Sequence, residues 1–94
     1  MGNAVVLGDT GSGHAGFPPT NVISAASSVK IDGKPAARKG DALMIHAKPK
    51  HPPHPRSINA GSGSVFIEGK PAARSGDAVS CGGSVQGGGS VNIG

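Results

Sequence analysis

Hydrophobic and polar positions alternate over short stretches of this chain and never form a long apolar run. β-Branched residues stand two positions apart at three places: Val29 and Ile31, Val65 and Ile67, and Val91 and Ile93. This period of two is typical of a half-buried β-strand. Glycine and proline recur too densely for a helix of normal length, so the pattern predicts an all-β chain of short strands and long turns.

One segment of the chain is present twice. Residues 29–41 recur without a gap as residues 65–77, and most positions are identical. Within each copy an Asp-Gly or Glu-Gly pair supplies a tight turn, because glycine tolerates a positive φ. Each copy therefore predicts a strand, a turn and a returning strand that ends in Gly-Asp. A repeat of this kind indicates similar structural units.

A third unit is divided between the two ends of the chain. Its end, Gly8-Asp9, matches the ends of the two copies, and its beginning, residues 90–93, matches their beginnings. The divided unit is complete only if the termini meet in space. We therefore predict a single domain over residues 1–94, with three similar β-hairpin units around a pseudo-threefold axis and the first and last segments paired.

Composition adds a constraint on stability. The 94 residues include 17 glycines, 8 prolines and two phenylalanines, with neither tryptophan nor tyrosine, so no large aromatic core can form. A chain this small usually needs a disulfide, a metal or a partner to be stable. Its single cysteine excludes an internal disulfide, which leaves a metal, a partner, or both.

The formal net charge is +4, a value that invites a nucleic-acid interpretation. The basic residues are spread along the chain, however, and no aromatic platform is available to stack bases, so a solvated basic surface explains them better. No apolar run approaches the roughly 20 residues of a membrane span, and the N-terminus lacks the basic start and long apolar core of a signal peptide. We therefore expect a cytoplasmic protein that, if it leaves the cell, uses no cleaved signal.

Each Gly-Asp is followed, at nearly constant spacing, by a residue that can bind a metal. His14 follows the first, His46 the second and Cys81 the third. If the units are related by a threefold axis, these side chains start from equivalent places and converge on that axis. Three imidazoles and one thiolate form a normal, closed tetrahedral zinc site, and iron(II) suits the same ligands less well. We predict structural zinc, which can contribute about 10 kcal/mol or more to folding.

The fourth ligand is expected from the connector between the two full copies, whose proline-rich centre predicts a stiff, polyproline-like loop. This connector holds both His51 and His54. His14 and His51 each precede a Pro-Pro pair, so His51 is the closer analogue and the preferred ligand. His54 is the alternative ligand, or else a surface or outer-shell residue. Solvated histidines and a cysteine that packs as a small hydrophobe explain the common spacing less well.

Catalytic chemistry has weaker support. The glycine-rich segments lack the lysine and the helix of a phosphate loop. A nucleophilic pairing of Cys81 with a histidine would need an open, hydrated pocket that so small a β unit can hardly enclose. The aspartates of the three Gly-Asp turns recur in every unit, so we assign them a structural role as turn caps, with Arg38 and Arg74 as partners. We predict no enzyme activity, and a small zinc hydrolase is the alternative from a different class.

Two motifs carry a resemblance to a known family. Residues 35–38 and 71–74 both read Pro-Ala-Ala-Arg, flanked by Gly-Lys and Gly-Asp. They resemble the name-giving motif of the PAAR-repeat family, and the likeness covers essentially the whole chain. The third unit departs from the family pattern because it lacks a Pro-Ala-Ala-Arg copy. The resemblance implies a short pointed cone of β-hairpins with a metal near its apex, in agreement with the divided unit.

Members of this family cap the trimeric spike protein VgrG of the type VI secretion system, and similar proteins tip contractile phage tails, which is the alternative setting. The resemblance implies one copy per VgrG trimer, no turnover, effector proteins as further partners, and secretion on the spike without a signal peptide. The broad base would bind the spike, and the metal-bound apex would help to pierce the target envelope. We place the base at apolar residues of exposed strand edges, which invite pairing with another β structure: Val29, Ile31, Val65, Ile67, Val91 and Ile93.

Overall fold

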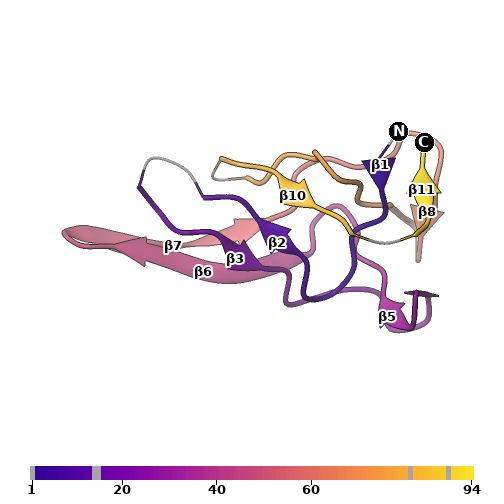
Figure 1. Ribbon diagram of the computed structural model, residues 1–94, viewed down its shortest axis with the longest axis horizontal. Helices are drawn as coiled ribbons and strands as arrows, with labels where there is room; N and C mark the ends of the chain where they lie inside the picture. The colour runs from indigo at the N-terminus through magenta and orange to yellow at the C-terminus, as the bar shows by residue number, and fades with distance from the viewer. Residues whose placement is uncertain (1, 14–15, 81, 89) are drawn as a thin grey trace.

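The computed structural model describes residues 2–13, 16–80, 82–88 and 90–94 and consists of short antiparallel β-strands (Figure 1). In chain order the strands are β1 (Gly2–Asn3), β2 (Thr10–Gly11), β3 (Thr20–Asn21), β4 (Lys30–Ile31), β5 (Lys34–Pro35), β6 (Ala42–Lys48), β7 (His51–Ser57), β8 (Phe66–Ile67), β9 (Lys70–Pro71), β10 (Val85–Gln86) and β11 (Asn92–Ile93). No helix occurs among the described residues, which confirms the predicted all-β class. These residues accordingly contain no helix that could cross a membrane.

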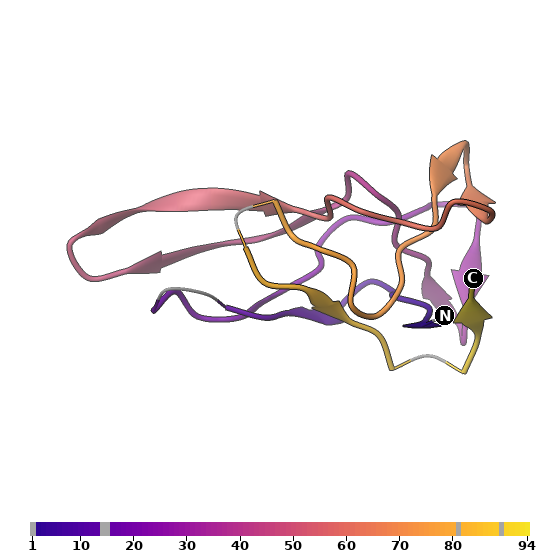
Figure 2. The same ribbon diagram turned by 90° about the horizontal axis from the view of Figure 1, so that it is seen from above.

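The strands are distributed along an elongated body whose principal extents are 40, 23 and 21 Å. The long hairpin of β6 and β7 reaches one end of the long axis (Figures 1 and 2). The short pairs β1–β11, β4–β5 and β8–β9 gather at the other end, beside both termini. We call this second end the hairpin face. Strands β10, β2 and β3 form a three-stranded sheet between the two ends.

The short pairs follow the predicted order of strand, turn and strand. β4–β5 and β8–β9 have the same register, with the isoleucine opposite the lysine in each. Their turns are Asp32-Gly33, with φ of 54° and 78°, and Glu68-Gly69, with φ of 51° and 80°. A hairpin turn with two successive positive φ values has a twist that matches that of its strands, and Asp-Gly adopts these values readily. The third pair, β1 with β11, joins the two ends of the chain, as the divided unit predicts.

A ring of backbone hydrogen bonds joins the three units to one another. The amide of Ala37 donates to the carbonyl of Val5 (2.8 Å), the amide of Ala73 to Ala37 (3.0 Å), and the amide of Val5 to Ala73 (3.2 Å). None of the three residues is more than 1% exposed. Small side chains are required here because interiors are close-packed and three backbones approach one another. Each unit thus buries the segment that contains its ring residue against the other two.

Aliphatic side chains fill both core clusters found among the described residues. The first cluster contains Val5, Val22, Ala37, Leu43, Ile58, Ala73, Val79 and Val85. The second, beneath the hairpin face, contains Ala4, Ala26, Ala36, Ile67, Ala72 and Ile93, with Val29 and Ile31 packed against it. Many members are alanines, and the stabilisation from burial scales with the apolar area removed from water. The core is therefore small, which agrees with the expected need for a further staple.

The connector between the two full copies differs from its predicted form. Instead of a polyproline-like loop, its centre forms β7, which pairs with β6 through register shifts on both sides of His46. β7 contains three prolines, at positions 52, 53 and 55. Proline has no amide proton to donate, so it is tolerated in edge strands, and both strands of a two-stranded sheet are edges. The predicted loop is therefore wrong, and this segment is one strand of a hairpin.

Candidate metal site

Two of the predicted metal ligands, His14 and Cys81, lie outside the described residues. The other three histidines lie on the long hairpin, His46 on β6 and His51 and His54 on β7. The strand register pairs His46 with His54, whereas His51 lies next to the hairpin turn. This placement puts His54 rather than His51 beside His46, and which of the two binds a metal stays a prediction.

His46 is buried and held in one orientation. It is 3% exposed, and its Nδ1 lies 2.9 Å from the carbonyl oxygen of Pro18. Because a carbonyl oxygen only accepts, Nδ1 donates to it, and in the tautomer that does so the lone pair is on Nε2. Backbone carbonyls orient many metal-ligating histidines in this way. The ring of His54 lies edge-on to that of His46, with 4.4 Å between centroids and planes at 85°, so the two imidazoles are in direct contact.

The ring of Phe17 packs against all three histidines of the long hairpin. Its centroid lies 4.8 Å from that of His46, 4.5 Å from that of His54 and 5.9 Å from that of His51. The Nζ atom of Lys48 lies 4.8 Å from the same centroid. The phenyl ring shields one side of the imidazoles from water, and a lower local dielectric strengthens polar interactions. Sequence reasoning gave Phe17 no role, because a lone aromatic in a loop carries no chemical signal.

The segments that flank His14 and Cys81 lie against each other. The amide of Ser12 donates to the carbonyl of Ser84 at 2.8 Å, and the amide of Ser84 donates to Oγ of Ser12 at 2.9 Å. β2 also pairs directly with β10. Within the described part of the chain, no three residues among His, Cys, Asp and Glu form a metal-binding group. A closed ligand set would therefore need side chains from outside that part.

Arg56, on β7, is buried at 2% exposure and reaches three segments. Its Nη1 donates to the carbonyl of Gly11 at 3.1 Å and to Oγ1 of Thr20 at 2.9 Å. Its Nη2 donates to the carbonyls of Ser12 and of Gly82, the latter at 3.4 Å. Among the described residues, no carboxylate forms an ion pair with it, so neutral oxygens satisfy its two Nη atoms, whereas its buried Nε has no hydrogen-bond partner there.

The contacts of Arg56 tie the segment before His14 to the segment after Cys81. Basic residues are scattered along the sequence, and nothing in it distinguishes this arginine from a solvated one. Its role was missed because its acceptors are backbone carbonyls, which carry no signature in the residue types. The sequence shows an arginine in a Pro-rich segment, but only the fold shows that this arginine is buried.

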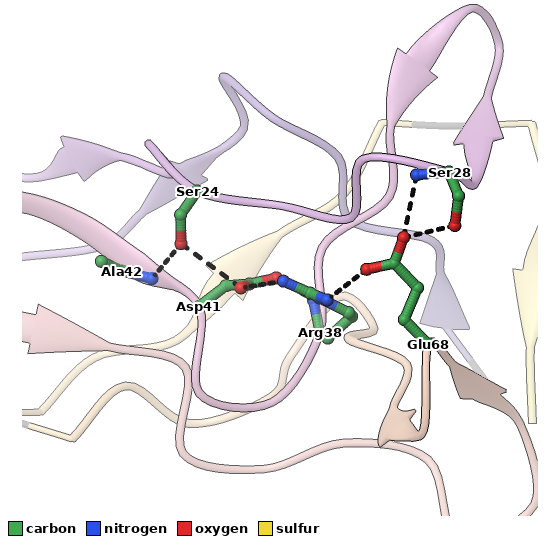
Figure 3. A network of polar contacts seen from close by, with 6 residues as sticks. All are labelled: Ser24, Ser28, Arg38, Asp41, Ala42 and Glu68. Atoms are coloured by element: carbon green, nitrogen blue, oxygen red, sulfur yellow. Dashed lines mark hydrogen bonds and ion pairs between the residues drawn. The ribbon is translucent and has the colours of Figure 1, made fainter.

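A second polar network joins two hairpins at the hairpin face (Figure 3). Nε and Nη2 of Arg38 donate to the two carboxylate oxygens of Asp41 at 3.0 and 2.8 Å, and Nη1 donates to Oε1 of Glu68 at 2.7 Å. Glu68 also accepts hydrogen bonds from the hydroxyl and the amide of Ser28. Asp41 raises the pKa of Arg38, and Ser28 lowers the pKa of Glu68. The predicted pairing of Arg38 with its Gly-Asp turn is confirmed.

Acid is expected to weaken the hairpin face. Asp32 accepts hydrogen bonds from the hydroxyl and the amide of Ser90 at 2.6 and 2.8 Å, and these lower its pKa, as Ser28 does for Glu68. A carboxyl whose pKa is lowered by folding contributes stability above its unfolded pKa and loses it as the pH falls through the folded pKa. We expect Asp32→Asn and Glu68→Gln to lower the melting temperature slightly at neutral pH and not at all in acid. A deficit that persists unchanged in strong acid would contradict this assignment.

The six apolar residues predicted to bind a partner divide by exposure. Ile67 and Ile93 are only 6% and 4% exposed and belong to the second core cluster. They cannot contact a partner unless the cluster unpacks, so they support the face from beneath. The other four keep accessible surface: Val65 and Val91 are exposed, and Val29 and Ile31 are partly buried.

Comparison with protein families gives one match. The family described as PAAR motif matches residues 12–87, which is more than half of the chain. The matched range includes both full copies of the repeat, both arginines of the repeated motif and every candidate metal ligand. Comparison with curated proteins found no match.

Proposed function

The chain belongs to the PAAR motif family, and we propose that it forms a metal-stapled tip on the end of the trimeric VgrG spike of a type VI secretion system. The family is structural and non-catalytic, and membership implies a spike-tip protein that binds VgrG and is delivered on the spike. The finer proposal is supported by the ring of hydrogen bonds, the histidines of the long hairpin and the apolar surface of the hairpin face.

The observation that carries the proposal is the closed ring formed by Val5, Ala37 and Ala73. Three similar units that bond in cyclic order support an approximate threefold axis, and a trimeric partner has a true one. A single copy would then present three similar hairpins to three identical chains. With the long hairpin at the opposite end, the proposed shape is a cone that is broad at the hairpin face and pointed at its apex.

In this proposal a structural zinc ion is held by His14, His46, Cys81 and one histidine of β7. His54 is favoured as the fourth ligand because it stands beside His46, and His51 is the alternative. The buried, carbonyl-oriented His46 fits a metal ligand. When bound, zinc would supply a four-coordinate crosslink between segments far apart in sequence. Iron(II) is the weaker candidate.

The spike would bind at the hairpin face. Phe66, Val65 and Val91 are 58%, 37% and 43% exposed there. β8 and β11 are edge strands with two residues each. Apolar side chains beside unpaired strand edges suit addition to another β structure. Effector proteins are the second class of partner, and the exposed apolar residues open to them away from the hairpin face include Ile23, Met44 and Ile45.

Two matched variants test the docking surface. Phe66→Asp introduces a charge on the hairpin face, whereas Met44→Asp does so on β6, at a residue of similar exposure (52%). Buried aromatic contacts at interfaces contribute about 2 kcal/mol or more, so we expect Phe66→Asp to weaken binding to a VgrG trimer at least about tenfold. Met44→Asp should bind like wild type, and both should melt like it. Equal binding by the two variants would refute this docking surface.

A further inference from the structure

The residue that begins each Gly-Asp turn occupies an equivalent position in the three units. Val6, Arg38 and Arg74 each form a bridge to the alanine two positions before the equivalent residue of the next unit: Ala36, Ala72 and Ala4. The amide of each donates to a carboxylate oxygen of the aspartate three residues later, at 2.9, 2.7 and 2.7 Å. The backbone is therefore the same at all three positions, but only two of them carry an arginine.

The two arginines fill a space between their own turn and a neighbouring segment. Arg38 spans Asp41 and Glu68 (Figure 3). Arg74 pairs with Asp77, with 3.0 Å between Nη2 and Oδ1, and also donates to the carbonyls of Gly61 and Gly94 at 3.1 and 3.3 Å. At both positions, a planar guanidinium joins a Gly-Asp turn to the next unit.

At the first position, Val6 leaves this space unfilled. A cavity of about 340 Å³ lies there, lined by Val6, Asp9, Asp32, Lys34 and Gly88. It could hold several water molecules, each of which takes about 30 Å³ in the liquid, and is ample for a guanidinium group. Asp9 is half-buried, whereas the corresponding aspartates beneath Arg38 and Arg74 are 4% and 7% exposed.

The cavity retains both carboxylates that hold an arginine in the second unit. Asp9 corresponds to Asp41. Asp32 corresponds to Glu68, because each is the first turn residue of its hairpin, has a positive φ of 54° or 51°, and accepts hydrogen bonds from a serine. Among the described residues, neither Asp9 nor Asp32 forms an ion pair.

We propose that this cavity binds the guanidinium group of an arginine side chain on a partner protein. The planar fork of arginine matches two carboxylates that face one site, whereas an ammonium offers only a point charge. Lys34 lines the cavity and competes for Asp32, but Lys70 occupies the corresponding place next to Glu68, and Glu68 still pairs with Arg38.

The position of the cavity indicates which partner supplies the arginine. Asp32 and Lys34 belong to the β4–β5 hairpin, so the cavity opens beside the hairpin face. The protein that docks on this face, which is VgrG in the proposed function, could insert one arginine into each copy of this chain. The other two equivalent positions are already filled by Arg38 and Arg74. None of the residues that line the cavity is a proposed metal ligand.

Titration with N-acetyl-arginine amide, followed by NMR of the isotope-labelled chain, tests the proposal directly. N-acetyl-lysine amide is the matched control, and the guanidinium ion at concentrations far below denaturing is a third probe. We expect the arginine derivative to shift the amide signals of Asp9, Asp32 and Gly88 in a saturable way, and the lysine derivative to do so much less. Equal responses to the two derivatives, or no saturable shift, would overturn the proposal. Binding of the guanidinium ion without binding of the arginine derivative would show that the cavity excludes a partner's side chain, and this result would also overturn the proposal.

Variants assign the response to the cavity. Asp32→Asn, in which asparagine also tolerates a positive φ, should weaken binding about tenfold, since hydrogen bonds to charged groups are the strong ones. Lys34→Ala should strengthen binding, because it removes the competing cation. Val6→Arg should abolish binding by filling the cavity from within, as Arg38 does in its own unit. Unchanged binding in Asp32→Asn would refute the site even if Val6→Arg failed to fold.

Discussion

Removal of the proposed zinc ion is expected to abolish most of the stability of this chain. Structural zinc contributes about 10 kcal/mol or more in small domains, and whole domains are stable by only about 5–15 kcal/mol. Here the two core clusters are built largely from alanine and valine, so little else can replace that contribution. For a chain of this size, each kcal/mol corresponds to about 4–8 °C in melting temperature, so we expect a chelator to lower it by tens of degrees.

Thermal unfolding and elemental analysis of the same samples measure this effect. Wild type should contain about one zinc per chain, and His46→Ala and Cys81→Ala should lose both the metal and the stability it provides. His54→Ala and His51→Ala form a matched pair: the variant that loses zinc identifies the fourth ligand, and we expect it to be His54→Ala. Melting that is identical with and without chelator would contradict the metal staple.

Replacement of Arg56 is expected to be the most damaging change outside the metal ligands. Arg56→Met keeps much of the buried volume but leaves the carbonyls of Gly11, Ser12 and Gly82 without their donor. A buried acceptor that loses its partner costs about 1–3 kcal/mol. With several acceptors affected, we expect a loss of at least about 3 kcal/mol in the free energy of unfolding, measured by urea denaturation.

Two controls separate the hydrogen bonds of Arg56 from its charge. Arg56→Lys keeps the positive charge but cannot reach all the acceptors with one ammonium group, so it should recover only part of the stability. Lys39→Met removes an exposed cation and should unfold like wild type. A full recovery by Arg56→Lys would show that charge alone matters, and it would contradict the role of the guanidinium fork.

The arrangement of the units could be predicted because the repeated residues mark where each unit begins and ends. The matching fragments at the two ends of the chain predicted the pairing of β1 with β11. The Asp-Gly and Glu-Gly pairs predicted the hairpin turns of β4–β5 and β8–β9. The hairpin turns are local features of backbone conformation, and the pairing of the chain ends follows from the repeat, so residue identity reports both.

Other features depend on contacts that residue identity does not record. The prolines of β7 predicted a loop, because their tolerance in a two-stranded ribbon depends on which edges are unpaired. The choice between His51 and His54 depends on strand register, and β6–β7 contains register shifts next to His46. The placement of His14 and Cys81 in a metal site stays a prediction.

The alternation of strand residues predicted only in part which of the six apolar residues are exposed. Val65 is exposed while Ile67, two positions later, is buried. The period of two assumes a continuous strand, and β8 has only two residues. Phe66 was passed over because it lies out of phase with the valine and isoleucine. It is nevertheless more exposed than the residues that were chosen.

The mass of the intact complex with a VgrG trimer tests the central claim most directly. A chain with three similar units and one hairpin face should cap a threefold spike once. Native mass spectrometry should therefore show one copy of this chain on three VgrG chains, and Phe66→Asp should remove that species. A complex with three copies per trimer, or the absence of any complex with the metal-loaded protein, would contradict its function as a single tip.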